Sequence, residues 1–343
     1  MKLIKKIIVI FFGNLFYIKL AQHKKKFVSF FILLKAYLID FKLFYRHSTI
    51  FRQNSFEKIE SLLILKYHSL EKGFLHNSIR FSFGKQTVIE IIKLLKREDI
   101  VENNTKTQIA AAYLSICTYY ELHIENNQDI SSFYSKDDYD FFKSISILDV
   151  ECTENMDAST YFRDINKNFY DFSLSRSSVR DFSGELVPFE KIVKVIDIAK
   201  YAPSVCNRQP VKIYYLDNKN KIDSIFDIQK GLKGYSDTVN QLLVVVSDRN
   251  YFYTTGERNQ FFIDGGLFLM NLLHSLHYYA IAACPAHWGL NHDADQQIMK
   301  ILKMKGSEKV ICLVPIGIPK NNFKTTLSLR RSTNEILIKV SEQ

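Results

Sequence analysis

The chain has 343 residues and a net charge of +10, with 47% apolar and 24% charged residues. That length suits about two domains of roughly 150 residues each, and the composition excludes a disordered or collagen-like chain. Twelve Lys and Arg against three acids give residues 1–60 a charge of +9, which leaves +1 for the rest of the chain.

The N-terminal segment is basic and apolar at once. Its first apolar run, Ile7 to Ile18, is interrupted by Gly13 and Asn14. This run is shorter than the about 20 residues that a membrane-spanning helix needs, and no small-residue cleavage site follows it. Lysines interleaved with aromatic residues predict one or two amphipathic helices. These would lie on an anionic membrane surface through residues 1–50 or pack on the body of the protein with solvated lysines.

Residues 55–150 carry mostly helical patterns. The stretch Thr105–Leu122 spaces five residues as the buried stripe of a helix: Ile109, Ala112, Tyr113, Ile116 and Tyr120. Just before it, the segment KYHSLEKGFLHNSIRFSFG contains His68 and Glu71. These two residues could form a ligand pair or an acid/base pair, but we favour a surface or interdomain contact with no catalytic role. A polar stretch at residues 151–160 is the predicted boundary, so we expect a basic segment (1–54), a helical extension (55–155) and a final domain (165–343).

From about residue 165 the pattern alternates between helices and short apolar strands. Pro188 suits the first turn of a helix whose apolar face includes Ile192 and Val195. Strands are predicted at VKIYYL, QLLVVVSD and KVICLVPIGIP, the second apolar enough to be buried on both faces. The helix predicted over Gln260–Ala283 is apolar around most of its circumference, which implies complete burial. The fold class is therefore α+β, with a mixed sheet flanked by helices.

Four motifs in this half of the chain occur together: RSSVRDF (176–182), APSVCNRQP (202–210), IDGGLFLMNLLHSLHYYAIAACPAHWG (263–289) and VPIGIP followed by LRR (314–319 and 329–331). In this order and spacing they resemble the FMN-dependent nitroreductase family from about Tyr170 to Val340. The resemblance implies a nitroreductase-like, dimer-forming fold that binds FMN. The segment around His68 resembles part of the N-terminal extensions of some long flavin-fold proteins.

The phosphate of FMN carries nearly two negative charges, and guanidinium groups bind such anions bidentately. Arg176 is the first candidate, with Ser177 and Ser178 donating hydroxyl hydrogen bonds. The resemblance places a second basic pair near the C-terminus on the same phosphate, matched by Arg330 and Arg331. Arg180 is expected to close a structural ion pair.

The flavin ring would have two further sets of neighbours. By the resemblance, the loop with Pro203, Ser204, Asn207 and Gln209 approaches the ring from the partner subunit of a homodimer, although ordinary turn chemistry also favours such residues. Pro285, Ala286 and His287 would face the N5 side of the ring, mainly through backbone. His287 is an alternative proton donor. Trp288 either lines the pocket or packs internally.

The implied activity is that of an FMN-dependent oxidoreductase. NAD(P)H would reduce the flavin, and a small nitro, quinone or similar acceptor would reoxidise it in a ping-pong cycle. One alternative is flavin-dependent modification of a glycan or lipid precursor, and another is a non-catalytic, membrane-associated partner protein. Cys206, Val211 and the pair Tyr279-Ala280 depart from the family pattern and put turnover in doubt.

Other classes of site and partner are not indicated. His274 and His277 lie one helical turn apart but lack a third ligand, so we expect no metal site. The apolar runs near the N-terminus suit lipid better than nucleic acid, and no nucleic-acid motif is present. Five scattered cysteines form no disulfide framework, which fits a cytoplasmic location or peripheral attachment to the inner face of the membrane.

Overall fold

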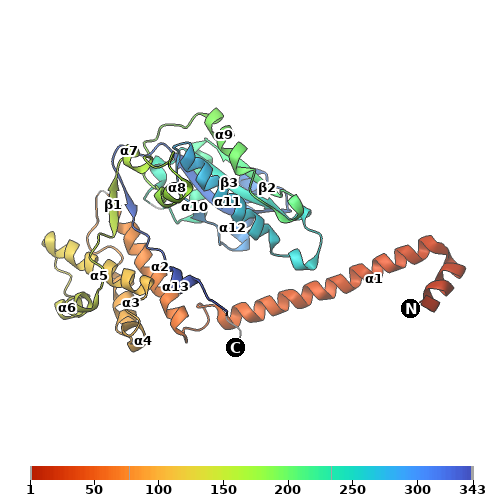
Figure 1. The fold of residues 1–343 in the computed structure, drawn as a ribbon, viewed down its shortest axis with the longest axis horizontal. Coiled ribbons are helices and arrows are strands. Elements are labelled where there is room, and N and C mark those ends of the chain that lie inside the picture. Colours follow the sequence, from red (N-terminus) through yellow and green to blue (C-terminus); the bar gives the residue numbers. More distant parts are fainter. Residues whose placement is uncertain (1, 77, 233, 341–343) are drawn as a thin grey trace.

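The computed structural model describes residues 2–76, 78–232 and 234–340, with the side chains of residues 2–9 and 11–13 left aside. Its body has a helical part and a sheet-containing part, from which one long helix projects (Figure 1). The helices are α1 (Lys2–His47), α2 (Phe56–Phe74), α3 (Lys85–Leu95), α4 (Glu98–Val101), α5 (Thr107–Glu125), α6 (Lys136–Ile145), α7 (Ala158–Tyr161), α8 (Phe169–Ser175), α9 (Phe189–Ala199), α10 (Lys219–Gln229), α11 (Gln260–Tyr278), α12 (His292–Leu302) and α13 (Thr333–Ile336). The strands are β1 (Thr153–Met156), β2 (Val211–Leu216), β3 (Gln241–Asp248), β4 (Ala282–Ala283), β5 (Ala286–His287), β6 (Glu308–Gly317) and β7 (Phe323–Thr326).

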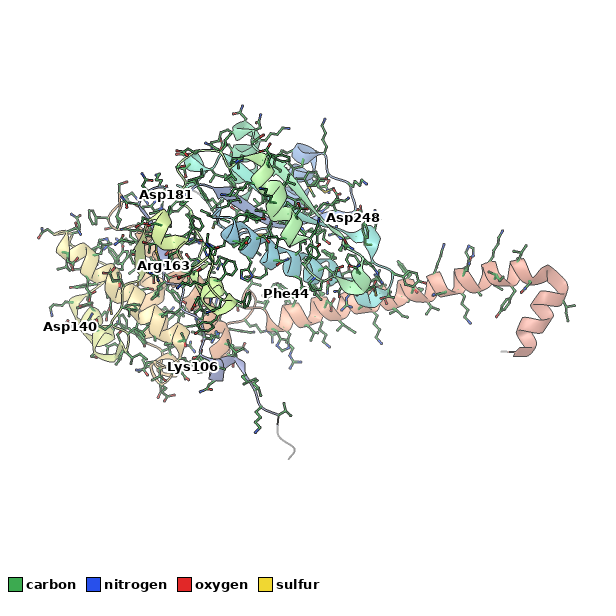
Figure 2. All side chains as sticks on the ribbon, turned by 45° about the horizontal axis from the view of Figure 1, so that its top comes forward. Phe44, Lys106, Asp140, Arg163, Asp181 and Asp248 are labelled. Atoms are coloured by element: carbon green, nitrogen blue, oxygen red, sulfur yellow. The ribbon has the colours of Figure 1, made fainter. Side chains whose placement is uncertain are left out.

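Helix α1 is one continuous helix, which agrees with the expected number of helices. Side chains stand out from it on all sides in Figure 2, and consecutive residues such as Phe30, Phe31 and Ile32 are all exposed. Apolar residues therefore surround the helix instead of forming one stripe, which corrects the expected amphipathicity. Asp40 joins α1 to the body by accepting from Nε and Nη2 of Arg258 at 2.8 and 2.9 Å. Among the described residues no helix combines the length and apolar character that crossing a membrane requires.

Helices α2–α6 enclose a core of their own. The expected stripe on α5 is confirmed for Ile109, Ala112, Tyr113 and Ile116, which are fully buried, whereas Tyr120 is only partly buried at its end. This core also contains α2 and α3 side chains such as Leu63 and Ile91, and it extends as far as Cys152. Separate clusters of buried residues begin at Tyr161 and Val187. The domain limits at 54, 155 and 165 remain a prediction.

The main sheet has the order β2–β3–β6–β4, with β5 also paired to β6. Helices α9 and α11 pack against one face, and α10 and α12 cover the other. This double cover explains why every residue of β3 is buried. The predicted α+β class is confirmed, but all strand pairings within the described ranges are antiparallel, where a mixed sheet was expected. Burial on both faces makes a strand apolar without fixing the direction of its neighbours.

Helix α11 is buried on one side only. Its inner side includes Phe261, Gly265 and Leu272, and Gly265 lies so close to Ile311 that an added Cβ would come within 2.7 Å of that side chain. Its outer side exposes 44–55% of Phe262, Ile263, Leu267, Met270 and Tyr278. No described element of the same chain covers that face, so the expected complete burial would require a partner chain.

A two-stranded ribbon links the two parts of the body. Strand β1, which follows the helical core, pairs antiparallel with β7 near the C-terminus, from Thr153 opposite Thr326 to Met156 opposite Phe323. The residues after β7 then run back along α2 and α5, where the Glu335 carboxylate accepts from the backbone N–H of Thr107 at 2.9 Å. This return path brings the C-terminal arginines close to the segment that follows α8.

Candidate functional site

A cavity of about 1010 Å³ lies between the β1–β7 ribbon, helices α7 and α8, and Met270 of α11. Arg176, Ser177 and Ser178 line it from the segment after α8, and Arg330 lines it from the segment after β7. The structure thus brings together four of the residues that the sequence assigned to one phosphate.

Arg176 is the most buried charge in this wall. Burial lowers its pKa, Tyr161 raises it, and the neighbouring Arg330 lowers it again. Within the described part of the chain, neither Arg176 nor Arg330 forms an ion pair with a carboxylate. Three acids line the same cavity: Asp164 pairs with Arg163 at 3.2 Å, Asp171 accepts from the side chain of Asn168, and Glu154 forms no ion pair with a described residue. Figure 2 labels Arg163 near the junction of the two parts of the body. The guanidinium donors of Arg176 and Arg330 are therefore not taken up by these carboxylates and remain available to an anionic group.

The two serines of the same segment, Ser177 and Ser178, make different contacts. The Ser177 carbonyl accepts from the Tyr161 hydroxyl at 2.6 Å, whereas its buried Oγ lies near the same hydroxyl without forming a hydrogen bond of good geometry. Ser178 interacts through its hydroxyl with the buried thiol of Cys284. An orphaned buried hydroxyl is costly in the absence of a ligand, so Ser177 Oγ marks the cavity wall as a place where a hydrogen-bonding group belongs.

His274 and His277, which the sequence analysis weighed only as possible metal ligands, stand behind this wall. His277 Nε2 lies 2.8 Å from Ser175 Oγ, and burial, with Arg176 and His274, lowers the pKa of His277 to about 4. Burial and Arg176 also lower the pKa of His274. Both imidazoles are therefore neutral near pH 7. Their i, i+3 spacing was visible in the sequence, but their proximity to Arg176 depends on how α8 packs against α11.

Arg331 does not line the cavity. Its guanidinium donates from Nη1 and Nη2 to both carboxylate oxygens of Glu60 on α2, at 2.9 and 2.8 Å. Glu60 is buried, with only 7% of its side chain exposed, so it requires a cation. This ion pair occupies the guanidinium of Arg331, so of the two predicted C-terminal arginines only Arg330 is available to a phosphate.

The loop with Pro203 and Ser204 lies elsewhere on the same chain. Ser204 Oγ accepts from the backbone N–H of Gln209 at 2.9 Å, and Asn207 Oδ1 accepts from the Gln209 side chain at 3.1 Å. The loop is joined to the start of α11, because the N–H of Val205 donates to Asp264 at 3.3 Å. Asp264 lies thirteen residues before His277, about 20 Å along the helix. Pro203, Ser204, Asn207 and Gln209 are accordingly absent from the cavity that Arg176 lines.

Three residues of this loop have a left-handed backbone conformation. Cys206, Asn207 and Gln209 have φ values of 50, 54 and 50°. Such conformations cost about 1 kcal/mol or more for residues other than glycine. They persist here because Arg208 is held by Glu257 at 2.8 Å, which fixes the loop from outside.

The segment from Pro285 to His287 lies at the edge of the sheet. Ala286 and His287 pair with Leu313 and Cys312 of β6, and the His287 carbonyl accepts from the Gln229 side chain at 3.0 Å. Proline has no N–H, so the predicted backbone donation is available only to Ala286 and His287 and not to Pro285. The His287 side chain is exposed and does not line the Arg176 cavity.

For two neighbours of these motifs the structure decides between expectations. Trp288 follows the second of its two expected alternatives: it is buried and packs internally, and its Nε1 donates to Asp295 at 2.8 Å. Arg180 does not close an ion pair with a described residue: the adjacent Asp181 pairs with Lys320 at 2.7 Å, and Nη1 of Arg180 is buried without a partner.

Comparison with known proteins gives the family of this region. Residues 174–248 match the model of the Nitroreductase family. Iodotyrosine deiodinase from Danio rerio is 24% identical over 209 residues, which cover 52% of this chain and 68% of the relative.

Two solved structures are also similar to part of this chain. A nitroreductase-like protein from Streptococcus mutans is 23% identical, with a TM-score of 0.44, covering 51% of this chain and 98% of its own. An FMN-dependent nitroreductase from Clostridium difficile is 20% identical, with a TM-score of 0.40, covering 46% and 91%. The family match confirms the resemblance for residues 174–248, a nitroreductase-family region that contains the first two motifs and Arg176, Ser177 and Ser178.

Proposed function

We propose that the protein is an FMN-dependent oxidoreductase that takes hydride from NAD(P)H and reduces a small electron acceptor. The observation that supports this best is the convergence of Arg176 and Arg330, far apart in the sequence, on one cavity where neither has a carboxylate partner among the described residues. Two guanidinium groups that form no ion pair with a carboxylate are suited to bind a doubly charged phosphate.

The residues present fit FMN. Arg176 and Arg330 would hold the phosphate, and the buried Oγ of Ser177 would donate to a phosphate or ribityl oxygen. The cavity, at about 1010 Å³, is at the upper end of the range for small-molecule sites. When bound, FMN would supply the hydride chemistry itself. The protein's own contribution is to bind, orient and shield.

A second copy of the chain would complete the site. The outer face of α11, with Ile263, Leu267 and Met270 exposed, is apolar enough to form a homodimer seam. Met270 also lines the Arg176 cavity, so a partner seated on this face would lie at the edge of the cavity. The loop from Pro203 to Gln209, too distant within one chain, would then approach from the partner.

The acceptor class is open to test. Nitro-aromatics and quinones are the first choice, and the relative named iodotyrosine deiodinase makes a halogenated phenol a third probe. Modification of a glycan or lipid precursor is the competing assignment, and a fold without turnover is another.

The test is a flavin spectrum of the purified full chain, followed by anaerobic addition of NADH or NADPH. We expect FMN to bind with a visible spectrum and to be bleached by one of the two nucleotides. Bound FMN that neither nucleotide bleaches would contradict the NAD(P)H step and favour the non-catalytic alternative. Failure to take up added FMN would overturn the proposal as a whole.

We also propose that α1 attaches the protein to an anionic lipid surface. Helix α1 carries many lysines and a single acid, Asp40, whose pKa is lowered by its bond with Arg258. Its remaining charge is therefore positive, and its exposed apolar side chains can enter the boundary between headgroups and acyl chains.

Flotation with phosphatidylserine vesicles tests this attachment. The wild type should float, and a Lys24→Glu/Lys26→Glu variant should float less. Phosphatidylcholine vesicles serve as the control for charge. Equal flotation of both proteins on both vesicles would contradict an electrostatic attachment.

A further inference from the structure

The backbone that carries Arg176 has no regular secondary structure. Residues 176–178 follow the end of α8 and belong to no helix or strand. Val179, the next residue, is held by its N–H, which donates to the Ala283 carbonyl at 3.1 Å. The place of Arg176 in the cavity wall therefore depends on the contacts that its immediate neighbours make.

Tyr161, the last residue of α7, holds the residue after Arg176. Its hydroxyl donates to the Ser177 carbonyl at 2.6 Å. Burial raises the pKa of this hydroxyl to about 12, so it remains a protonated donor near neutral pH. Tyr161 also lines the same cavity as Arg176, which places this hydrogen bond in the wall of the candidate site.

His277 of α11 holds the residue before Arg176. Ser175 Oγ donates to the Phe172 carbonyl at 2.9 Å and lies 2.8 Å from His277 Nε2. Because a hydroxyl has one hydrogen to donate, Nε2 is the donor in its contact with Ser175. Arg176 is thus flanked by two residues that are each held by a buried ring.

The ring of Tyr161 is itself fixed by packing. Its centroid lies 5.1 Å from the ring of His277 and 5.7 Å from the ring of Phe323 in β7, both in edge-on contacts. The start of α7 is fixed as well, because the Asp157 carboxylate accepts from the backbone N–H of Thr160 at 2.9 Å. The hydroxyl is therefore presented from a rigid position, and its removal alone would leave the packing of the ring in place.

Tyr161 lies outside the part of the chain that matches the family model, residues 174–248. Helix α7 follows β1 directly, and β1 pairs with β7, the strand that leads to Arg330 (Figure 1). The β1–β7 ribbon therefore connects to two residues of the cavity, Tyr161 after one strand and Arg330 after the other.

A tyrosine that bonds a carbonyl can be purely structural, as Tyr119 is. Its hydroxyl donates to the Phe83 carbonyl at 2.9 Å within the helical part. Tyr161 differs because it fixes the residue next to Arg176, a half-buried guanidinium that forms no ion pair with a carboxylate of the described residues. A guanidinium that is already held in place loses less conformational entropy when an anion binds.

We propose that Tyr161 and His277 are positioning residues for Arg176: by fixing the residues on either side of it, they set the affinity of the cavity for the phosphate of FMN. This inference rests on the proposed function, and it gives the segment before the matched region a part in selecting the cofactor. The two residues would contribute to the preference for FMN over riboflavin, which lacks the phosphate, and not to binding of the ring.

The test compares Tyr161→Phe with wild type in the full chain, because phenylalanine keeps the ring and removes only the hydroxyl. Tyr119→Phe is the matched control, since it removes the same kind of hydrogen bond from a buried tyrosine that does not line the cavity. The readouts are the Kd of FMN, the Kd of riboflavin and the melting temperature without ligand. Ser175→Ala removes the contact with His277 and carries the same test if Tyr161→Phe does not fold.

We expect Tyr161→Phe to weaken FMN binding about tenfold, the size of effect that one buried hydrogen bond has, and riboflavin binding less than about twofold. Ser175→Ala should lower the preference for FMN in the same way, by about threefold. Tyr119→Phe should keep the wild-type Kd of both ligands, although its melting temperature should fall as that of Tyr161→Phe does. In an Arg176→Ala background, Tyr161→Phe should cause no further loss of FMN affinity, because a residue that acts through another is not additive with it.

Separate outcomes identify separate failures. If the wild type binds FMN no better than riboflavin, the proposed phosphate site fails and this inference with it. If the wild type prefers FMN and both Tyr161→Phe and Ser175→Ala keep that preference, only the inference is overturned. Equal losses of FMN and riboflavin affinity in Tyr161→Phe, or a further loss of FMN affinity in the Arg176→Ala background, would show that Tyr161 supports the fold and not Arg176.

Discussion

Charges in the helical region and charges around the cavity are arranged differently. In the helical region, several exposed cations pair with acids: Lys96 pairs with Asp138, Lys136 with Asp140 and Lys143 with Glu121. At the cavity, the half-buried Arg176 and the exposed Arg330 form no ion pair with a carboxylate of the described residues. A surface pair contributes little to stability, whereas burying part of a cation without a counter-charge is costly. Arg176 therefore marks a candidate ligand site.

The adjacent residues Arg330 and Arg331 show the same contrast over one peptide bond. Arg331 forms a bidentate ion pair with buried Glu60, while Arg330 lines the cavity. One arginine joins the C-terminal segment to α2, and the other remains available to a ligand. The predictions below test this division, beginning with the largest expected effect.

Removal of Arg331 should act on stability. In Arg331→Ala the Glu60 carboxylate stays buried without its cation, so the free energy of unfolding should fall by about 3 kcal/mol. Urea denaturation measures this loss, with Arg330→Ala as the matched control that should stay close to wild type. If the two variants are equally stable, the contrast between these neighbours is wrong.

His277 should make stability depend on pH. Its pKa is about 4 in the folded protein and about 6.5 when unfolded, so the unfolded chain binds its proton first. The stabilising contribution is complete above pH 6.5 and is lost as the pH falls toward 4. In His277→Gln, the fall in unfolding free energy across this window should be smaller by up to about 3 kcal/mol.

Denaturation at several pH values between 4 and 7 checks this difference. His287→Gln is the control, because the His287 side chain is exposed. Identical slopes for His277→Gln and wild type would contradict the burial of a neutral imidazole behind Arg176.

A charge on the outer face of α11 should separate the proposed dimer. Ile263→Asp should give a monomer and weaken FMN binding about 100-fold, equivalent to about 2.7 kcal/mol, because the partner's loop would be lost. Leu65→Asp changes an exposed apolar residue of α2 and should leave the assembly intact. Light scattering and FMN titration provide the readouts. A monomeric Ile263→Asp with normal FMN affinity would show that one chain is sufficient.

Local patterns in the sequence predicted much of the fold. The strands VKIYYL and QLLVVVSD match β2 and β3 residue for residue, and the helical character of residues 55–150 was also anticipated. The antiparallel direction of the strands was not anticipated. A strand buried on both faces is apolar whether its neighbours run parallel or antiparallel to it. The outer face of α11 could not be separated from its inner face, since both are apolar.

The site was predictable only in part, for a physical reason. Motifs identified Arg176, Ser177, Ser178 and Arg330, which the fold brings to one cavity. The partner of Arg331 could not be read from the sequence, because Glu60 lies far away and pairs only through tertiary packing.

The preference of the full chain for FMN over riboflavin tests the central claim most directly, because the two differ only in the phosphate. Arg176 and Arg330 should make the wild type bind FMN at least about 100-fold more tightly, since each charge-assisted contact contributes about 1.5–3 kcal/mol. Arg176→Ala should lose at least about tenfold of that preference, with little change in riboflavin affinity. Equal affinity of the wild type for FMN and riboflavin would contradict a phosphate site formed by these two arginines.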